Sequence, residues 1–450
     1  MSSSNSTATL YSCSSGIEKL EDVKIESVPT GPTERARKQV RWWMFLAIAA
    51  CIVATVNDVF VNLYCPDKKC ITKSVNKSKS NDKDSTLMSP CPRMPTIRPL
   101  PSPLPVKLQD VFDDLDSILM EMVDNNTSLP AISANIFYRD SVLWSGHHGS
   151  KLFQINAKPD GNTVYRIGSI TKIFAVLLMY KLYEEGVIGS VDDPLSKYIP
   201  EFSIQNPFTS DNITLREIAS QMSGLPREAP CIYHCEGTNS TEQLSLLKNR
   251  SLVLTPWKMP SYSNLGYALL GRLLTEKVLN TTFESWIQDE ILAPLEMNNT
   301  GFEITSHVER NMAFPYGNNG KRMPFMKIGC AVPAGGMYST INDLTKLGMM
   351  FTRPSKQSVF QASTLREISL PVDIAPDGRT LWGSPFEMFL SNGFLVRSKG
   401  GNIDTYDAYF LFVPQLELGI NVSHQLMEVR THIRSKGVRH APASPQQDTV

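Results

Sequence analysis

The sequence predicts an α+β domain, in which strands from both ends form one antiparallel sheet and a helical subdomain lies between them. Two β-type runs open the apolar part, within residues 132–149, and three more close it, within residues 393–423. The segments between them have helical periodicity. The chain does not show the regular alternation of strands and helices that would predict a doubly wound parallel sheet.

A basic flank and a long apolar run precede this domain. Residues 1–41 are rich in Ser, Thr and charges, and residues 42–64 are apolar over most of their length. At about 1.5 Å per residue, the apolar run can cross the roughly 30 Å core of a bilayer. Basic residues before a span favour a cytosolic N-terminus, so we expect a cytosolic tail (1–41) and a type II signal anchor (42–64). A cleaved signal peptide and a buried soluble helix are the alternatives.

Glycosylation acceptors and cysteines favour a lumenal or extracellular position for the rest of the chain. Sequences of the form Asn-x-Ser/Thr begin at Asn76, Asn125, Asn126, Asn212, Asn239, Asn249, Asn280, Asn298 and Asn421. Of the 8 cysteines, Cys231 and Cys235 are spaced for a local disulfide. A zinc site that includes His234 is the alternative, but no second ligand pair stands nearby.

The remaining boundaries follow from composition and periodicity. Residues 65–107 become proline-rich and are predicted to be a solvated stalk, residues 108–424 the folded domain, and residues 425–450 a disordered tail. Lys+Arg and Asp+Glu both number 44, so no charge excess indicates a nucleic-acid partner.

Within the domain, three local patterns set the first elements. A helix is expected over residues 106–123, with an apolar face formed by Val111, Leu115, Ile118, Leu119 and Met122. A hairpin is expected around Arg139-Asp140. A second helix begins at Ser169 and ends before Gly186, which suits the C′ position.

Ser169 and Lys172 form the first candidate catalytic pair. Serine needs an adjacent base, and a spacing of three puts both side chains on one helix face. The apolar neighbours of Lys172 would lower the pKa of its amine by desolvation and leave a neutral base. By itself, however, the tetrapeptide is more typical of an N-capping serine and a solvent-facing lysine.

Two further motifs could be catalytic, but each also fits an ordinary structural role. Tyr262 and Asn264 precede an apolar helix, where a phenol could relay a proton and an amide could hold a substrate carbonyl. A core tyrosine followed by a helix-capping Asn264 is as good an interpretation. Lys399-Gly400-Gly401 could supply a cation and close backbone approach, or could be a hairpin turn.

In this order, S-x-x-K, Y-x-N and K-x-G resemble the signature of the serine beta-lactamase and penicillin-binding-protein superfamily. The resemblance extends over about residues 108–424 and is closest to the class C and esterase-like branch. Similar sequence blocks are RIGSITKIF, VDDPLSKYIPEF, ITLREIASQMSGLP, SYSNLGYALLG, ILAPLEMNNTGF and AGGMYSTINDLTKLG.

The resemblance implies a beta-lactamase/transpeptidase-like fold and a serine hydrolase that forms an acyl-enzyme with an ester, amide or peptide substrate. It implies no metal and no cofactor. The implied roles are Ser169 as nucleophile, Lys172 and Tyr262 in proton transfer, Asn264, Lys399 and Gly401 in substrate binding, and the backbone N–H groups of Ser169 and Asn402 as the oxyanion hole.

Two departures from the family pattern leave alternatives open. Many esterase-like members have histidine in place of Lys399, and family domains usually end in an amphipathic helix, of which residues 421–436 offer at most a short one. A catalytically inactive binding or scaffold protein with this fold is therefore the second hypothesis. The sequence does not separate peptidase, esterase and amidase activity, nor does it give an oligomeric state.

Overall fold

In the computed structural model of the protein, the described residues are 97, 99–124, 129–152, 155–228, 240–317, 320–356, 359–391 and 393–428. The predicted cytosolic tail and signal anchor lie outside these ranges, as do Cys231, His234 and Cys235. Of the helices in the described ranges, none has the length and apolar character needed to cross a bilayer.

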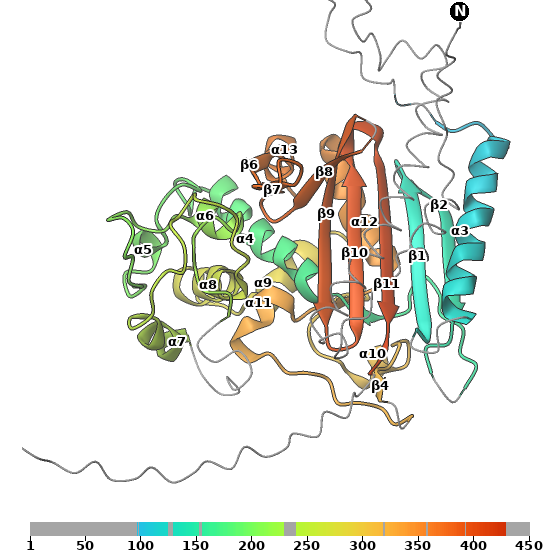
Figure 1. Ribbon diagram of the computed structural model, residues 1–450, viewed down its shortest axis with the longest axis horizontal. Helices are drawn as coiled ribbons and strands as arrows, with labels where there is room; N and C mark the ends of the chain where they lie inside the picture. Colours follow the sequence, from blue (N-terminus) through green and yellow to red (C-terminus); the bar gives the residue numbers. More distant parts are fainter. Residues whose placement is uncertain are drawn as a thin grey trace, which may run out of the picture.

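An eight-stranded antiparallel sheet forms the centre of the domain, in the order β2-β1-β11-β10-β9-β8-β7-β6 (Figure 1). As predicted, the first and last long strands are neighbours: Ala131 of β1 pairs with Gln425 of β11, and Tyr138 pairs with Leu418. Its strands are β1 (Ala131–Tyr138), β2 (Ser141–Gly149), β6 (Pro371–Ile374), β7 (Leu381–Gly383), β8 (Glu387–Ser391), β9 (Phe394–Ile403), β10 (Tyr406–Val413) and β11 (Leu418–Gln425).

Four short strands form two further pairs, β3 with β5 and β4 with β12. They are β3 (Tyr165–Arg166), β4 (Tyr316–Gly317), β5 (Tyr338–Ser339) and β12 (Met427–Glu428). Single helical turns are η1 (Gly168–Thr171), η4 (Gly329–Ala331), η5 (Pro354–Lys356) and η6 (Pro414–Leu416), and π-helical turns are η2 (Leu274–Val278) and η3 (Gln288–Leu292).

The helical subdomain lies on one side of the sheet, in the chain between β2 and β6 (Figure 1). The helices are α3 (Val106–Asp124), α4 (Lys172–Glu184), α5 (Leu195–Tyr198), α6 (Leu215–Ala219), α7 (Ser240–Leu247), α8 (Asn264–Leu273), α9 (Phe283–Ile287), α10 (Ser306–Glu309), α11 (Val332–Gly335), α12 (Ile341–Thr352) and α13 (Ala362–Ile368). Gly186 follows α4 with φ +74°, which confirms it at the C′ position.

Both faces of the central strands are apolar and buried. In β10, Phe410 and Phe412 pack into the core shared with the helical subdomain, whereas Leu411 and Val413 pack into a second core on the opposite face. Period-two alternation places successive side chains on opposite faces. The sheet is therefore a middle layer, and each face needs its own cover.

Helix α3 covers part of that second face. Leu108, Phe112, Leu115 and Leu119 are its buried residues, and Val111 and Met122 flank them at intermediate exposure. The predicted helix is confirmed, but the predicted face omitted Leu108 and Phe112, which are buried, and three of its members are only partly buried. The buried residues follow i, i+4, i+7 and i+11 spacing from Leu108, which also makes a continuous face.

The second core also includes residues that the sequence assigned to the stalk. Ile97, Leu100 and Leu104 pack against the same cluster as α3. A proline-rich composition indicated an extended, solvated segment, yet its apolar side chains are spaced so that they reach the sheet. The packed domain therefore includes residues before 108.

The C-terminal run continues the sheet and does not begin with a helix. Residues 418–425 form β11, and β12 pairs in parallel with β4. Leu418, Ile420 and Val422 alternate with smaller or polar residues, and this period of two fits a strand. The predicted closing strand within residues 416–423 is thus confirmed, and no helix forms in residues 421–428; residues after 428 lie outside the described ranges.

Asn421 lies at the centre of this strand and is completely buried. Its Nδ2 donates to Oδ1 of Asn135 at 3.0 Å and to Oγ1 of Thr345 at 3.1 Å, so β11, β1 and α12 are held together. A buried amide cannot carry a glycan, which excludes Asn421 as an acceptor in the folded domain. In contrast, Asn212, Asn249, Asn280 and Asn298 are exposed.

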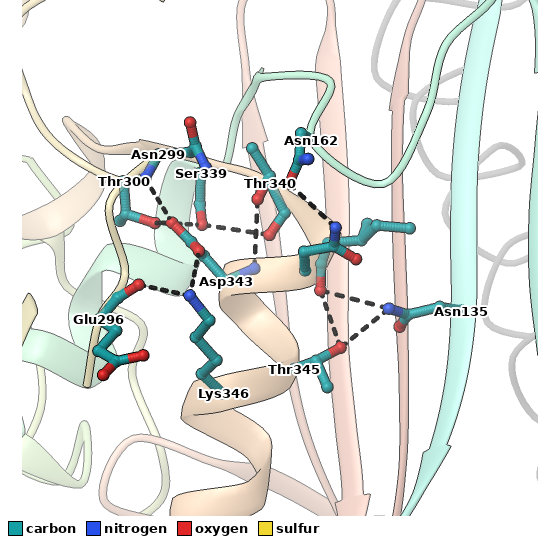
Figure 2. A network of polar contacts seen from close by, with 12 residues as sticks. Asn135, Asn162, Glu296, Asn299, Thr300, Ser339, Thr340, Asp343, Thr345 and Lys346 are labelled. Carbon is teal, nitrogen blue, oxygen red and sulfur yellow. Dashed lines mark hydrogen bonds and ion pairs between the residues drawn. The ribbon is translucent and has the colours of Figure 1, made fainter. Parts of the chain in front are cut away.

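A polar network at the start of α12 ties the helical subdomain to the sheet (Figure 2). Asp343 is buried and accepts from the Asn299 backbone N–H at 2.7 Å and from the Thr300 hydroxyl at 2.9 Å. Two residues further along α12, Thr345 accepts from Asn135 of β1 at 2.9 Å. These contacts satisfy buried polar groups that would otherwise be costly.

Candidate active site

Ser169 and Lys172 meet where η1 leads into α4. Nζ of Lys172 lies 3.0 Å from Oγ of Ser169, as the spacing of three predicts. Lys172 has no exposed surface, whereas Ser169 is partly exposed. Neither η1 nor α4 has a side-chain N-cap from Ser169. The alternative of a capping serine with a solvent-facing lysine is therefore wrong.

Burial decides the charge that Lys172 can hold. Residues 172–180 of helix α4 are all buried, so desolvation lowers the pKa of Lys172, and the positive charge of Lys399 adds to this effect. Besides contacts with the hydroxyls of Ser169 and Tyr262, its hydrogen bonds go to two oxygens that can only accept, the backbone carbonyl of Ala334 at 2.6 Å and Oδ1 of Asn264 at 2.7 Å. A neutral amine has two N–H groups for these oxygens, which leaves its lone pair for the hydroxyl of Ser169.

Asn264 is the first residue of α8, but it does not cap this helix. The cap is Ser263, whose hydroxyl accepts from the Gly266 N–H at 3.0 Å. The side chain of Asn264 instead lies between Lys172 and Glu228, because its Nδ2 is 3.1 Å from both carboxylate oxygens of Glu228. An acceptor on one side and a donor on the other fix the orientation of the amide.

Tyr262 lies between two lysines. Its ring centroid is 4.9 Å from Nζ of Lys172 and 5.3 Å from Nζ of Lys399. Burial alone would raise the pKa of Tyr262, but the positive charges of Lys172, once it has taken a proton, and of Lys399 outweigh burial and lower it. Tyr262 is thus an acidic phenol beside the serine and not a core tyrosine.

Lys399 lies inside β9, two positions before Gly401 on the same face of the strand. The alternative of a hairpin turn is wrong, because β9 continues to Ile403. Nζ of Lys399 pairs with Oε1 of Glu387 on β8 at 2.9 Å. Burial would lower the pKa of Lys399, but the Glu387 carboxylate outweighs burial and raises it, so the lysine stays charged.

The backbones around the two predicted oxyanion N–H groups are in direct contact. A Cβ on Gly401 would lie 1.9 Å from the Ile167 carbonyl oxygen and 2.8 Å from the Ser169 nitrogen. A Cβ on Gly168 would lie 2.7 Å from the Asn402 nitrogen. Only glycine permits this approach, so the N–H groups of Ser169 and Asn402 lie on adjoining segments.

The structure therefore brings together all the predicted site residues and adds groups that the sequence analysis missed. These are the carboxylates of Glu228 and Glu387 and the backbone carbonyl of Ala334. Glu228 follows the SGLP block by two positions, which placed it near the site but gave it no role. Glu387 stands in no motif, and its place follows from pairing of β8 with β9.

Comparison with known proteins agrees with this geometry. Residues 112–436 match the family described as Beta-lactamase. The chain belongs to the beta-lactamase family. The resemblance to the serine beta-lactamase and penicillin-binding-protein superfamily is thereby confirmed, and membership indicates a hydrolase-type function.

Two eukaryotic relatives of this family member are similar over most of its length. The human protein named "Putative beta-lactamase-like 1" is 35% identical over 339 residues, which are 73% of this chain and 67% of the relative. "Beta-lactamase-like protein 2" of Dictyostelium discoideum is 34% identical over 334 residues, 71% of this chain and 60% of the relative. The match thus spans less than two thirds of the Dictyostelium protein.

Solved structures share the fold of this beta-lactamase family member. A class C beta-lactamase has a TM-score of 0.61 at 21% identity, over 72% of this chain and 92% of the other. The octameric penicillin-binding protein homologue from Pyrococcus abyssi has a TM-score of 0.61 at 23% identity, over 70% and 73%. At these identities the likeness concerns the fold alone, and it agrees with the predicted α+β architecture.

Proposed function

We propose that this beta-lactamase family member is a serine hydrolase that acts through an acyl-enzyme on an ester, amide or peptide substrate. The observation that carries the proposal is the 3.0 Å contact between Ser169 and a completely buried Lys172. A desolvated amine beside a partly exposed serine is the arrangement that an activated nucleophile needs.

Acylation follows from these contacts. The Ser169 hydroxyl attacks the substrate carbonyl carbon and gives its proton to the neutral amine of Lys172. The N–H groups of Ser169 and Asn402 stabilise the negative charge that develops on the carbonyl oxygen. Tyr262, with its lowered pKa, passes the proton to the leaving group as the carbon–leaving group bond breaks. Water then hydrolyses the ester on Ser169.

Lys399 adjusts the pKa values of the two groups that transfer the proton. Its charge lowers the pKa values of both Lys172 and Tyr262, and Glu387 moderates that effect from the neighbouring strand. As a buried cation beside Tyr262, Lys399 also supplies positive potential for a carboxylate on the substrate.

A fluorophosphonate probe on the purified protein tests the nucleophile. We expect covalent labelling at Ser169 and its complete loss in Ser169→Ala, with an unchanged melting temperature. Ser261→Ala is the matched control, because this hydroxyl is close in sequence to Tyr262 but belongs to none of the three motifs. Absence of labelling in well-folded wild-type protein would favour the inactive binding or scaffold hypothesis.

We further propose that residues 42–64 anchor the protein as a single-pass type II membrane protein, with its domain lumenal or extracellular. The exposed positions of Asn212, Asn249, Asn280 and Asn298 support this proposal, since all four could receive glycans. In expressing cells, PNGase F should increase the electrophoretic mobility of the protein, and alkaline carbonate should not extract it from membranes. Release by carbonate, or no mobility change, would contradict it.

A further inference from the structure

Glu228 is a carboxylate beside the proposed catalytic groups that the mechanism above does not use. Both carboxylate oxygens lie 3.1 Å from Nδ2 of Asn264, whose Oδ1 accepts from Lys172 at 2.7 Å. The Glu228 side chain is 34% exposed, so it touches the site on one side and solvent on the other.

The charge of Glu228 is only weakly matched by the protein. The buried cation Lys399 is paired with Glu387 and is not available to it. Arg227 lies 3.3 Å from Glu228, but 66% of the Arg227 side chain is exposed, and such a pair is largely screened by water. Both Glu228 oxygens accept from the neutral Asn264 amide, but no buried cation among the described residues is paired with them, so a ligand cation that displaces this water would add a charge-assisted hydrogen bond.

Glu228 also changes what Asn264 can offer to a substrate. An amide group facing an open site would donate its N–H groups to a carbonyl on the acyl half of the substrate. Here the nitrogen faces the Glu228 carboxylate, so a negatively charged acceptor lies where a neutral donor was expected. A peptide carbonyl complements such a position poorly, whereas an ammonium group complements it well.

We propose that Glu228 binds a protonated amine on the acyl half of the substrate, so that the preferred substrates are peptides or esters with a free amino group next to the reacting carbonyl. This inference rests on the proposed serine hydrolase function. An α-amino nitrogen is two bonds from the carbonyl carbon that Ser169 attacks, so it stays close to the groups around Ser169, of which Asn264 and Glu228 are linked to the nucleophile through Lys172. Acetylation of that amine removes both the charge and two donors.

A pair of diphenyl phosphonate probes tests the amine without requiring turnover. In both, the Ser169 oxygen forms a bond to phosphorus, the bond to one phenoxy group breaks, and phenol leaves with the serine proton. One probe is an α-aminoalkyl phosphonate with a free amine, and the other is its N-acetyl form. We expect wild-type protein to react about tenfold faster with the free amine, the effect of one charge-assisted hydrogen bond.

Three variants test whether Glu228 causes the preference for the free amine. Glu228→Gln keeps the shape but removes the charge, and it should reduce the ratio of the two rates to within about twofold of one. Glu228→Asp keeps the charge and should retain a preference for the free amine. Glu290→Gln makes the same change at an exposed glutamate of η3 and should leave the ratio as in the wild type.

The fluorophosphonate probe separates the two proposals. If it labels Ser169 while the phosphonate rates are equal, or favour the acetylated probe, or keep their ratio in Glu228→Gln, the amine proposal is overturned and the hydrolase proposal stands. Labelling by neither phosphonate while fluorophosphonate reacts also overturns the amine proposal. If no probe labels well-folded protein, both proposals are overturned.

Discussion

Nζ of Lys172 lies 3.0 Å from Oγ of Ser169, at a position where the lysine has no exposed surface. The two acceptor-only oxygens on its other sides use the N–H groups of a neutral amine, and its lone pair then faces the hydroxyl. Desolvation lowers the pKa of Lys172 in the same direction. Burial and hydrogen bonding thus both favour the neutral amine of Lys172.

Lys172→Met should remove the base and preserve the packing, because the two side chains have similar volume and the site is buried. We expect fluorophosphonate labelling to slow by a factor of about 10² to 10⁴, the usual contribution of a positioned general base. Lys181→Met is the matched control, since Lys181 lies on the same helix and its contacts with the Val359 carbonyl, Glu185 and the Phe360 ring are all outside the site. Equal rates in Lys172→Met and wild type would show that another group takes the proton.

Replacing Lys399 and replacing Glu387 with uncharged residues should shift the pH dependence of acylation in opposite directions. The positive charge of Lys399 lowers the pKa values of Lys172 and Tyr262, so Lys399→Met raises both values and moves the rising limb of the pH–rate profile to higher pH. The negative charge of Glu387 raises both pKa values, so Glu387→Gln moves the same limb to lower pH.

The measurement is the rate of fluorophosphonate labelling across the pH range in which each variant stays folded. Lys248→Met, at an exposed lysine, is the control for a change in net charge and should leave the limb in place. Shifts of the same sign in Lys399→Met and Glu387→Gln would contradict electrostatic coupling through this pair.

Gly401→Ala should impair the oxyanion site. The new Cβ would lie 1.9 Å from the Ile167 carbonyl oxygen and 2.8 Å from the Ser169 nitrogen, so the two backbones must separate. Loss of one oxyanion donor typically costs a factor of about 10² to 10³ in rate, and we expect a slowing of that order in hydrolysis of an activated ester. Gly189→Ala is the control, because the atom nearest to its Cβ would be the carboxylate end of Asp193, at 3.3 Å, and no backbone is among its three nearest neighbours. A wild-type rate in Gly401→Ala would place the oxyanion elsewhere.

Asn421 should be a structural residue and not a glycan acceptor. Asn421→Ala removes the hydrogen bonds that Asn421 donates to Asn135 Oδ1 and Thr345 Oγ1, and it should lower the free energy of unfolding by about 1–3 kcal/mol. Ser423→Ala destroys the same acceptor sequence but removes a buried hydroxyl that has no hydrogen-bond partner among the described residues, so it should cost much less.

Denaturant unfolding of the two variants measures this difference, and mass spectrometry after PNGase F in heavy-oxygen water measures site occupancy. We expect the glycan signal at exposed acceptors such as Asn212 and Asn280 and none at Asn421. A glycan on Asn421 of folded protein, or equal destabilisation by both variants, would disagree with the buried network.

The order of the local elements could be predicted from the sequence because it depends on short-range patterns. The helix at residues 106–123, the hairpin at Arg139-Asp140 and the three closing strands all have a periodicity that neighbouring residues set by themselves. The spacing of Ser169 and Lys172 likewise fixed their contact, because three residues make about one helical turn.

Tertiary structure decided what each of these residues contacts. The sequence left Asn264 as a possible helix cap and Lys399 as part of a possible turn, since both alternatives have the same local pattern. Only the packed domain shows that Ser263 caps α8 and that β9 continues past Lys399. Glu228 and Glu387 reach the site from loops or strands far away in the chain, and contacts of this kind depend on strand pairing and burial, which no short motif encodes.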